Sequence, residues 1–266
     1  MGRTEAGTMD VRSAALDRTT LVDAAKATYS LAIILVLWEI VTQLGFVHYY
    51  FLPPLSDILL RFAEMTVDGT MIHNGYLTIR RALIGLLLAC GAGITVGVLS
   101  ARSRIMGWFW DPIIEVGYPV PVIALVPVFL FWFGTGDLPK IALVTLGCFW
   151  PVALNARNAT RNVDENLVWS ARMMGTSDRH LLRKVIVPAA APGIISGVQI
   201  ALPISLIITF VFEMVAGGGG LGHIEIQGVR SFDSAQVYAT LIAIMIIGFV
   251  LDRGLRTARS RLLAWT

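Results

Sequence analysis

The chain has 266 residues, of which 56% are hydrophobic and only 15% are charged, and its mean hydropathy is +0.71. Soluble domains carry about 25% charged residues, so this composition indicates an integral membrane protein. The net charge of +3 comes with no separate basic domain, which argues against nucleic acid as a partner. Cys90 and Cys148 lie in apolar runs, which argues against a disulfide framework.

Six apolar segments follow a polar N-terminus. Residues 1–26 lack the apolar core and the cleavage site of a secretory signal, so we expect a cytoplasmic tail followed by an uncleaved anchor. A spanning helix needs about 20 mainly apolar residues. The fourth segment is the weakest candidate, because it is short and contains Trp150 and Pro151. The sequence predicts an all-α integral membrane protein with six transmembrane helices, at roughly 27–46, 81–101, 112–133, 139–156, 189–215 and 235–255.

The loop after the first predicted span contains an additional apolar segment. Residues 51–65 are apolar at helical spacing but carry Asp57, Arg61 and Glu64. We expect an amphipathic helix at the membrane surface rather than a span. The loop would comprise residues 47–73 and precede a core domain at 74–255.

The distribution of lysine and arginine predicts the orientation, because these residues are enriched in cytoplasmic loops. With the N-terminus inside, sixteen of the 21 lysine and arginine residues fall on the cytoplasmic side and five fall outside. We therefore expect both termini, including a C-terminal tail at 256–266, to be cytoplasmic in a plasma or inner membrane. The five outer residues are Arg61, Arg80, Arg81, Lys140 and Arg230.

The largest cytoplasmic loop, 157–188, is predicted to contain two short helices. Asp164 can cap the first helix, which reads ENLVWSARMM, and Gly175 can end it with a positive φ. Ser177 can cap a second helix that runs to about Val187, where Pro188 would break it.

The first of these helices has an apolar face that needs a partner. Its members, at i, i+3 and i+4 spacing, are Leu167, Val168, Ala171 and Met174. One interpretation places the helix on the inner membrane surface, where the neighbouring basic residues would meet anionic lipid. The other, which the defined turn favours, is a docking surface for a cytoplasmic protein.

This loop resembles the signature of binding-protein-dependent ABC importer permeases: Glu-Ala-Ala, three residues, Gly, nine residues, and Ile-x-Leu-Pro. The spacing is kept here, although Trp169 replaces the acid and Ser170 the first alanine. Val185 and Val187 replace the isoleucine and the leucine. The resemblance implies a loop helix that docks in a groove of a cytoplasmic ATPase. The residues expected at this contact are Leu167, Val168, Trp169, Ser170, Ala171, Arg172, Met173, Met174, Gly175 and Pro188.

Two further stretches resemble permeases for aliphatic sulfonates, taurine, nitrate and related small compounds. They are YPVPVIALVPVFLFWFGTGDLPKI at 118–141 and GGLGHIEIQG at 219–228. The likeness runs from about Asn74 to the C-terminus and implies a type I ABC importer permease fold. It also implies two ATPase copies that bind ATP and Mg, an extracytoplasmic solute-binding protein that largely sets specificity, and a second permease copy, most simply in a homodimer.

The glycine-rich run AGGGGLG, at 216–222, is not expected to hold a phosphate. It follows a span on the outer side and contains no lysine, and the chain has no G-x-x-x-x-G-K-[ST] motif for binding ATP. We expect a flexible external turn that is a candidate gate element.

Prolines indicate where the predicted spans depart from regular helix. Pro119, Pro121 and Pro127 lie close together in the third span, and Pro192 and Pro203 lie in the fifth. Irregular backbone survives at membrane depth only where protein or water satisfies its carbonyls. A packing kink would explain any single proline, but the group of three predicts a discontinuous element beside a pathway. The second span carries glycines that would allow close helix packing, namely Gly85, Gly91, Gly93 and Gly97.

Three acidic residues lie at or near membrane depth, where ionisable groups are costly. We expect Glu39 to face a neighbouring helix or to be protonated, and Glu115 to lie near the inner interface. Glu213 is a pathway or gating candidate, although a lone acid would repel an anionic substrate. The residues predicted for the pathway or gate are Tyr118, Pro119, Pro121, Pro127, Pro203, Glu213 and Gly219.

Other functional classes fit the sequence less well. The histidines are scattered in loops without metal-ligand spacing, so we expect neither a metal nor a cofactor on this chain, and no catalytic residues. A gradient-driven secondary transporter, the main alternative, would carry broken helices in repeated halves, and no internal repeat is evident. Dependence of uptake on ATP hydrolysis in a separate subunit distinguishes the two.

Overall fold

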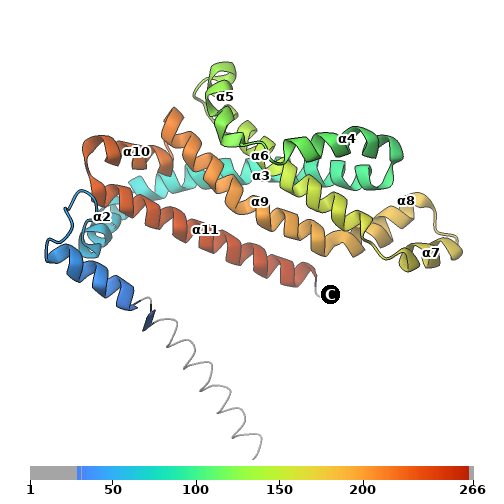
Figure 1. Cartoon of the computed structure of the whole chain (residues 1–266), viewed down its shortest axis with the longest axis horizontal. Helices are drawn as coiled ribbons and strands as arrows, with labels where there is room; N and C mark the ends of the chain where they lie inside the picture. The colour runs from blue at the N-terminus through green and yellow to red at the C-terminus, as the bar shows by residue number, and fades with distance from the viewer. Residues whose placement is uncertain (1–28, 31, 264–266) are drawn as a thin grey trace, which may run out of the picture.

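The computed structural model describes residues 29–30 and 32–263, and none of these residues forms a strand. The long helices run side by side along the longest axis of the molecule (Figure 1). Shorter helices gather at its two ends. One end holds α2 (Leu55–Val67) and α10 (Leu221–Ser231), and the opposite end holds α7 (Glu165–Met173) and α8 (Asp178–Leu181).

Four helical stretches among the described residues are long and apolar enough to cross a membrane. They are α3 (Thr70–Arg102), α6 (Asp137–Arg161), the stretch Asp178–Ala216 that ends with α9, and α11 (Ser234–Leu262). All four extend beyond the predicted spans. The early part of α3 shows why, since Met71 and Thr78 are buried there, so packing continues the helix outside the apolar window. The fourth predicted span, the weakest candidate from the sequence, is confirmed: it is the 25-residue helix α6.

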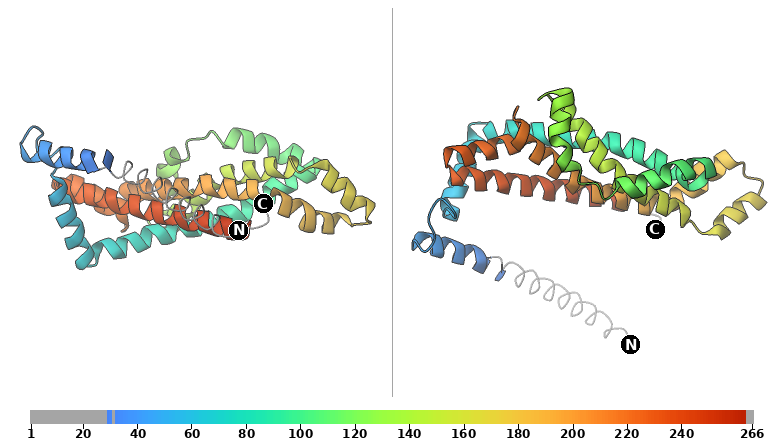
Figure 2. Two further views of the ribbon diagram at one scale, coloured as in Figure 1. Left: turned by 90° about the horizontal axis from the view of Figure 1, so that it is seen from below. Right: turned by 45° about the horizontal axis from the view of Figure 1, so that its top comes forward.

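The third predicted span is two helical pieces bent by 89°. The first piece, α4 (Arg104–Gly117), begins eight residues before the predicted start, because the Ser103 side chain caps it. The second piece consists of a 3₁₀ turn and α5 (Val126–Phe133), which projects from the bundle (Figure 2). Counted as one span, the pair raises the number of crossings to five. The predicted discontinuity is confirmed, but the predicted bounds are wrong.

The fifth predicted span is continuous with the second loop helix, so the predicted break at Pro188 is wrong. A π-helical turn, Leu182–Ile186, connects α8 to α9 (Val187–Ala216), and Pro188 lies in the first turn of α9. Proline cannot donate to the carbonyl four residues earlier, and its ring clashes with that carbonyl. The wider π turn accommodates the ring without ending the helix.

The first predicted span lies partly outside the described residues. Its described part forms the helix Ala32–Gln43, which lies beside α2 at one end of the bundle (Figures 1 and 2). Trp38 packs edge-on against Tyr238 of α11, with 5.9 Å between ring centroids. The helix predicted at 51–65 is observed as α2, which begins after Pro53 and Pro54. Its Arg61 forms an ion pair of 2.9 Å with Asp233, the residue before α11.

The apolar core lies between α3, α6, α9 and α5, with the most extensive contact between α3 and α6. Glycines make this contact close. A Cβ at Gly97 would come within 2.5 Å of the Ala153 carbonyl oxygen, and one at Gly93 within 3.0 Å of the Phe149 oxygen. Gly91 is different, because a Cβ there would meet nothing within 4 Å. Within the described residues, Gly91 therefore takes no part in this close contact.

Candidate functional site

The loop at 157–188 has the predicted helix–turn–helix form. Asp164 caps α7 by accepting a hydrogen bond from the Asn166 N–H at 2.8 Å. Gly175 has a φ of +77°, and its N–H donates to the Arg172 carbonyl at 2.9 Å. Ser177 occupies the N-cap position of α8, but its hydroxyl bonds to the side chain of His180 rather than to the backbone.

The apolar residues of α7 face two directions. Ala171 is buried and Val168 half-buried against a cluster from α3, α6 and α9, which fixes the loop to this end of the bundle. Leu167 and Met174, predicted for the same face, are exposed instead. They belong to an outward surface that includes the 60% exposed Trp169 and the 88% exposed Met173. The helix thus leaves apolar side chains free for another contact.

The break between α4 and α5 opens beside a cavity of about 370 Å³. The cavity contains no charged group. Tyr118, predicted for the pathway, lines it at the point where α4 ends, and Trp150 faces it from α6. The other residues of its wall are Val120, Val122, Ile123, Gly147, Pro151, Ile204, Ile207 and Ile208.

The remaining predicted pathway residues lie in other places. Pro119 and Pro121 form the break itself, whereas Pro127 lies in the first turn of α5. Pro203 is inside the uninterrupted α9 and lines a separate apolar cavity of about 260 Å³. Sequence reasoning missed Trp150 and the isoleucines of α9, because apolar residues in an apolar span give no signal of their own.

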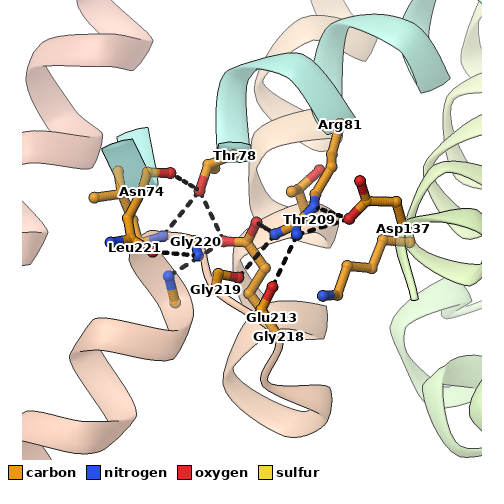
Figure 3. A network of polar contacts seen from close by, with 12 residues as sticks. Asn74, Thr78, Arg81, Asp137, Thr209, Glu213, Gly218, Gly219, Gly220 and Leu221 are labelled. Atoms are coloured by element: carbon orange, nitrogen blue, oxygen red, sulfur yellow. Dashed lines mark hydrogen bonds and ion pairs between the residues drawn. The ribbon is translucent and has the colours of Figure 1, made fainter. Parts of the chain in front are cut away.

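Glu213 lies in a buried network of ion pairs and hydrogen bonds at the end of the bundle that holds α10 (Figure 3). Its Oε1 accepts from Arg81 Nη1 at 2.6 Å, and its Oε2 accepts from the Thr78 hydroxyl at 2.8 Å. Arg81 also pairs with Asp137 at 2.7 Å, and Arg80 pairs with the same carboxylate. Since Arg81 neutralises Glu213, the expected repulsion of an anion by a lone acid does not arise.

The glycine run is part of this network rather than a free turn. Residues 217–220 all have positive φ, which explains the four consecutive glycines. The carbonyls of Gly218 and Gly219 accept from Arg81 at 3.0 and 2.8 Å, and Lys140 donates to Gly217 at 2.7 Å. The Gly220 N–H donates to Asn74 at 2.7 Å. The predicted flexibility is therefore wrong.

Arg81 and Lys140, which the sequence analysis counted among the outer charges, are buried. Arg81 is 2% exposed and Lys140 is fully buried. Buried charges are tolerated when they are paired. Two cations and one acid at similar predicted depth could therefore have predicted a buried network of charges. That signal was missed because the residues lie on three different helices.

The other two acids are accounted for by polar partners. Glu39 is half-buried and accepts a hydrogen bond from the Ser56 N–H, in the first turn of α2, at 3.2 Å. Glu115, on α4, pairs with Arg157 at 3.1 Å. Among the described residues, no cluster of three or more histidine, cysteine, aspartate or glutamate side chains could hold a metal ion.

Comparison with known proteins defines the class. Residues 93–262 match the model of the binding-protein-dependent transport system inner membrane component family. A putative aliphatic sulfonates transport permease protein of Bacillus subtilis is 32% identical, with 88% of this chain and 85% of the relative covered. The taurine transport system permease protein of Escherichia coli is also 32% identical, covering 89% and 88%. A formylaminopyrimidine transport permease protein of Halalkalibacterium halodurans is 26% identical, covering 91% and 96%.

Solved structures agree on the fold. A chain of the MetNI methionine ABC transporter, in an inward-facing form, superposes with a TM-score of 0.63 at 20% identity, covering 72% of this chain and 96% of that one. A chain of an amino acid ABC transporter gives 0.61 at 16% identity, covering 77% and 97%. The predicted type I permease fold is confirmed.

These findings define a multi-pass membrane subunit of a transporter rather than an enzyme. The chain belongs to the family of inner membrane components of binding-protein-dependent transport systems. It is the permease subunit of an ABC importer, in which a separate subunit hydrolyses ATP.

Proposed function

We propose that this chain pairs with a second copy to form the translocation pathway of an importer for a small organic solute, of the sulfonate or taurine type. A solute-binding protein delivers the solute from outside, and two ATPase copies, which bind ATP and Mg, lie below. Both termini are then cytoplasmic. The names of the two relatives at 32% identity support this choice of substrate.

The observation that carries the proposal is the exposed apolar surface of α7. Leu167, Trp169, Met173 and Met174 point away from the bundle, next to a turn fixed by Gly175. Exposed apolar patches with defined geometry mark protein contacts. We assign this surface to the ATPase groove, so that nucleotide-driven closure moves α7 and, through Ala171 and Val168, the helices behind it.

The cavity at the helix break supports a pathway beside α4 and α5. It opens where Tyr118 and Trp150 face apolar residues of α9, and it offers no cation to hold an anionic group. Selection of a sulfonate therefore rests on the solute-binding protein, and the permease wall accommodates the organic part.

Variants of Gly175 test the docking assignment in the complete transporter. Gly175→Pro removes the N–H that caps α7 and cannot adopt a φ of +77°. We expect it to abolish uptake while ATP hydrolysis continues. Gly175→Asn, which tolerates positive φ, is the control and keeps most of the uptake. Normal uptake by Gly175→Pro would exclude a role of this turn in coupling.

A further inference from the structure

The inner end of the molecule holds a basic cavity that is separate from the apolar cavity at the helix break. It has a volume of about 440 Å³ and lies between the end of α3, helix α7, and the stretch formed by α8 and the π turn. Three arginines from three different elements line it, together with one aspartate and an apolar floor. The lining residues are Arg102, Arg172, Asp178, Arg179, Leu181, Leu182 and Ile186.

The positive charge of this cavity is poorly compensated. The single acid, Asp178, is 92% exposed in its side chain, and its closest approach to Arg172 is 3.8 Å. Arg102 and Arg179 form no ion pair with any of the described residues, and Arg102 and Arg172 repel each other. Like charges held together without a counter-ion favour binding of an anion.

We propose that this cavity binds a phosphate group, presented by an anionic lipid headgroup of the inner leaflet or by a soluble phosphate compound. The planar arginine fork suits phosphate oxygens, and groups from three elements can surround one anion. Arg102 is the last residue of the spanning helix α3, which places the cavity at the membrane–water boundary. The apolar floor of Leu181, Leu182 and Ile186 suits the glycerol and acyl carbons of a lipid.

A bound phosphate would join the end of α3 to the two loop helices. Arg102 belongs to the rigid span, whereas Arg172 and Arg179 belong to α7 and α8. The exposed apolar residues of α7 do not line the cavity, whereas Arg172 belongs both to the cavity and to the contact predicted for the ATPase, so phosphate and the ATPase would use adjoining surfaces. Occupancy would therefore hold the docking helix in a fixed orientation and make transport sensitive to the anion.

Thermal unfolding of the purified full-length chain in neutral detergent tests the site. Wild type is compared with Arg102→Gln/Arg179→Gln and with the control Arg253→Gln, an exposed arginine of α11 that does not line the cavity. One arm adds phosphatidylglycerol, with phosphatidylcholine as its reference. A second arm adds inorganic phosphate, with chloride at equal ionic strength as its reference.

We expect phosphatidylglycerol to raise the melting temperature of wild type and Arg253→Gln by about 5 °C near saturation, and the double variant to lose this rise. A rise of the same pattern with inorganic phosphate alone would support the site and assign it to a soluble compound. Equal responses of all three proteins in both arms would overturn it. So would loss of ATPase binding by the double variant without lipid or phosphate, since the arginines would then serve the protein partner.

Discussion

The guanidinium of Arg81 and the carboxylate of Glu213 face each other at 2.6 Å, and neither side chain is more than 3% exposed. This pair joins α3 to α9 near α10 and holds the glycine run that leads into α10 (Figure 3). A buried pair of this kind is costly to form but more costly to break, because removal of one partner leaves the other charge uncompensated.

We expect Arg81→Met to destabilise the chain by about 3–5 kcal/mol. The substitution leaves Glu213 buried without its cation and removes two hydrogen bonds to the glycine run. Arg81→Met/Glu213→Met should recover part of the loss, since it removes both charges. Thermal unfolding in detergent measures both variants. If Arg81→Met were as stable as the wild type, the ion pair would not stabilise the contact between α3 and α9.

The contact between α3 and α6 should respond differently to two similar substitutions. Gly97→Ala would place a Cβ within 2.5 Å of the Ala153 carbonyl oxygen, which is backbone and cannot move aside. Overpacking of this kind costs about 1–3 kcal/mol. Gly91→Ala meets nothing within 4 Å, and alanine favours helix, so we expect it to be neutral or stabilising. Melting temperatures that fall equally for both would contradict the close contact.

Gly220 should tolerate a side chain less well than Gly134, although both have positive φ. Both glycines combine positive φ with an extended ψ, a region that costs alanine about 1–3 kcal/mol at either position. At Gly220, where φ is +105°, the added Cβ would also meet the Glu213 carboxylate, whereas at Gly134 it meets nothing within 4 Å. We expect Gly220→Ala to reduce both stability and uptake, and Gly134→Ala to cause the smaller loss in thermal unfolding. Equal losses would mean that the glycine run and Glu213 are not in contact.

Glu225 on α10 should make the stability of the folded chain depend on pH. Burial raises the pKa of this carboxyl above its usual value of about 4.5, and its Oε2 has no hydrogen-bond partner within the described residues. The ionised form is therefore disfavoured in the folded protein, and stability falls as the pH rises from that usual value through the raised pKa. We expect Glu225→Gln to raise the melting temperature at pH 7.5 and to have little effect near pH 4.

The exposed Glu165 provides the control for this experiment. Glu165 lies in the first turn of α7, where an acid is weakly favourable. Glu165→Gln should therefore not raise the melting temperature at pH 7.5. A gain for Glu225→Gln that is equally large at pH 4 and pH 7.5 would show that burial of the charge is not the cause.

Local patterns correctly predicted α7 and the turn at Gly175, but not the continuous helix through Pro188. The Asp164 cap, the positive φ of Gly175 and the short α7 all follow from residues within a few positions of one another. Pro188 by itself predicts a helix break. The π turn that accommodates it lies where Ile186 and Leu181 pack in the core, and residue spacing does not reveal such packing. The split of the apolar face of α7 likewise depends on which side meets the bundle.

Short-range features of the sequence were enough to predict the membrane class, the all-helical fold, the break within the third span and the helix–turn–helix form of the loop at 157–188. These follow from hydropathy, proline positions and caps, which act over short distances along the chain. The burial of Arg81 and Lys140, the neutralisation of Glu213 and the cavity shared by Tyr118 and Trp150 depend instead on how the helices pack. The partners lie on different helices, in some cases more than 130 residues apart, and no local pattern specifies which helix faces meet.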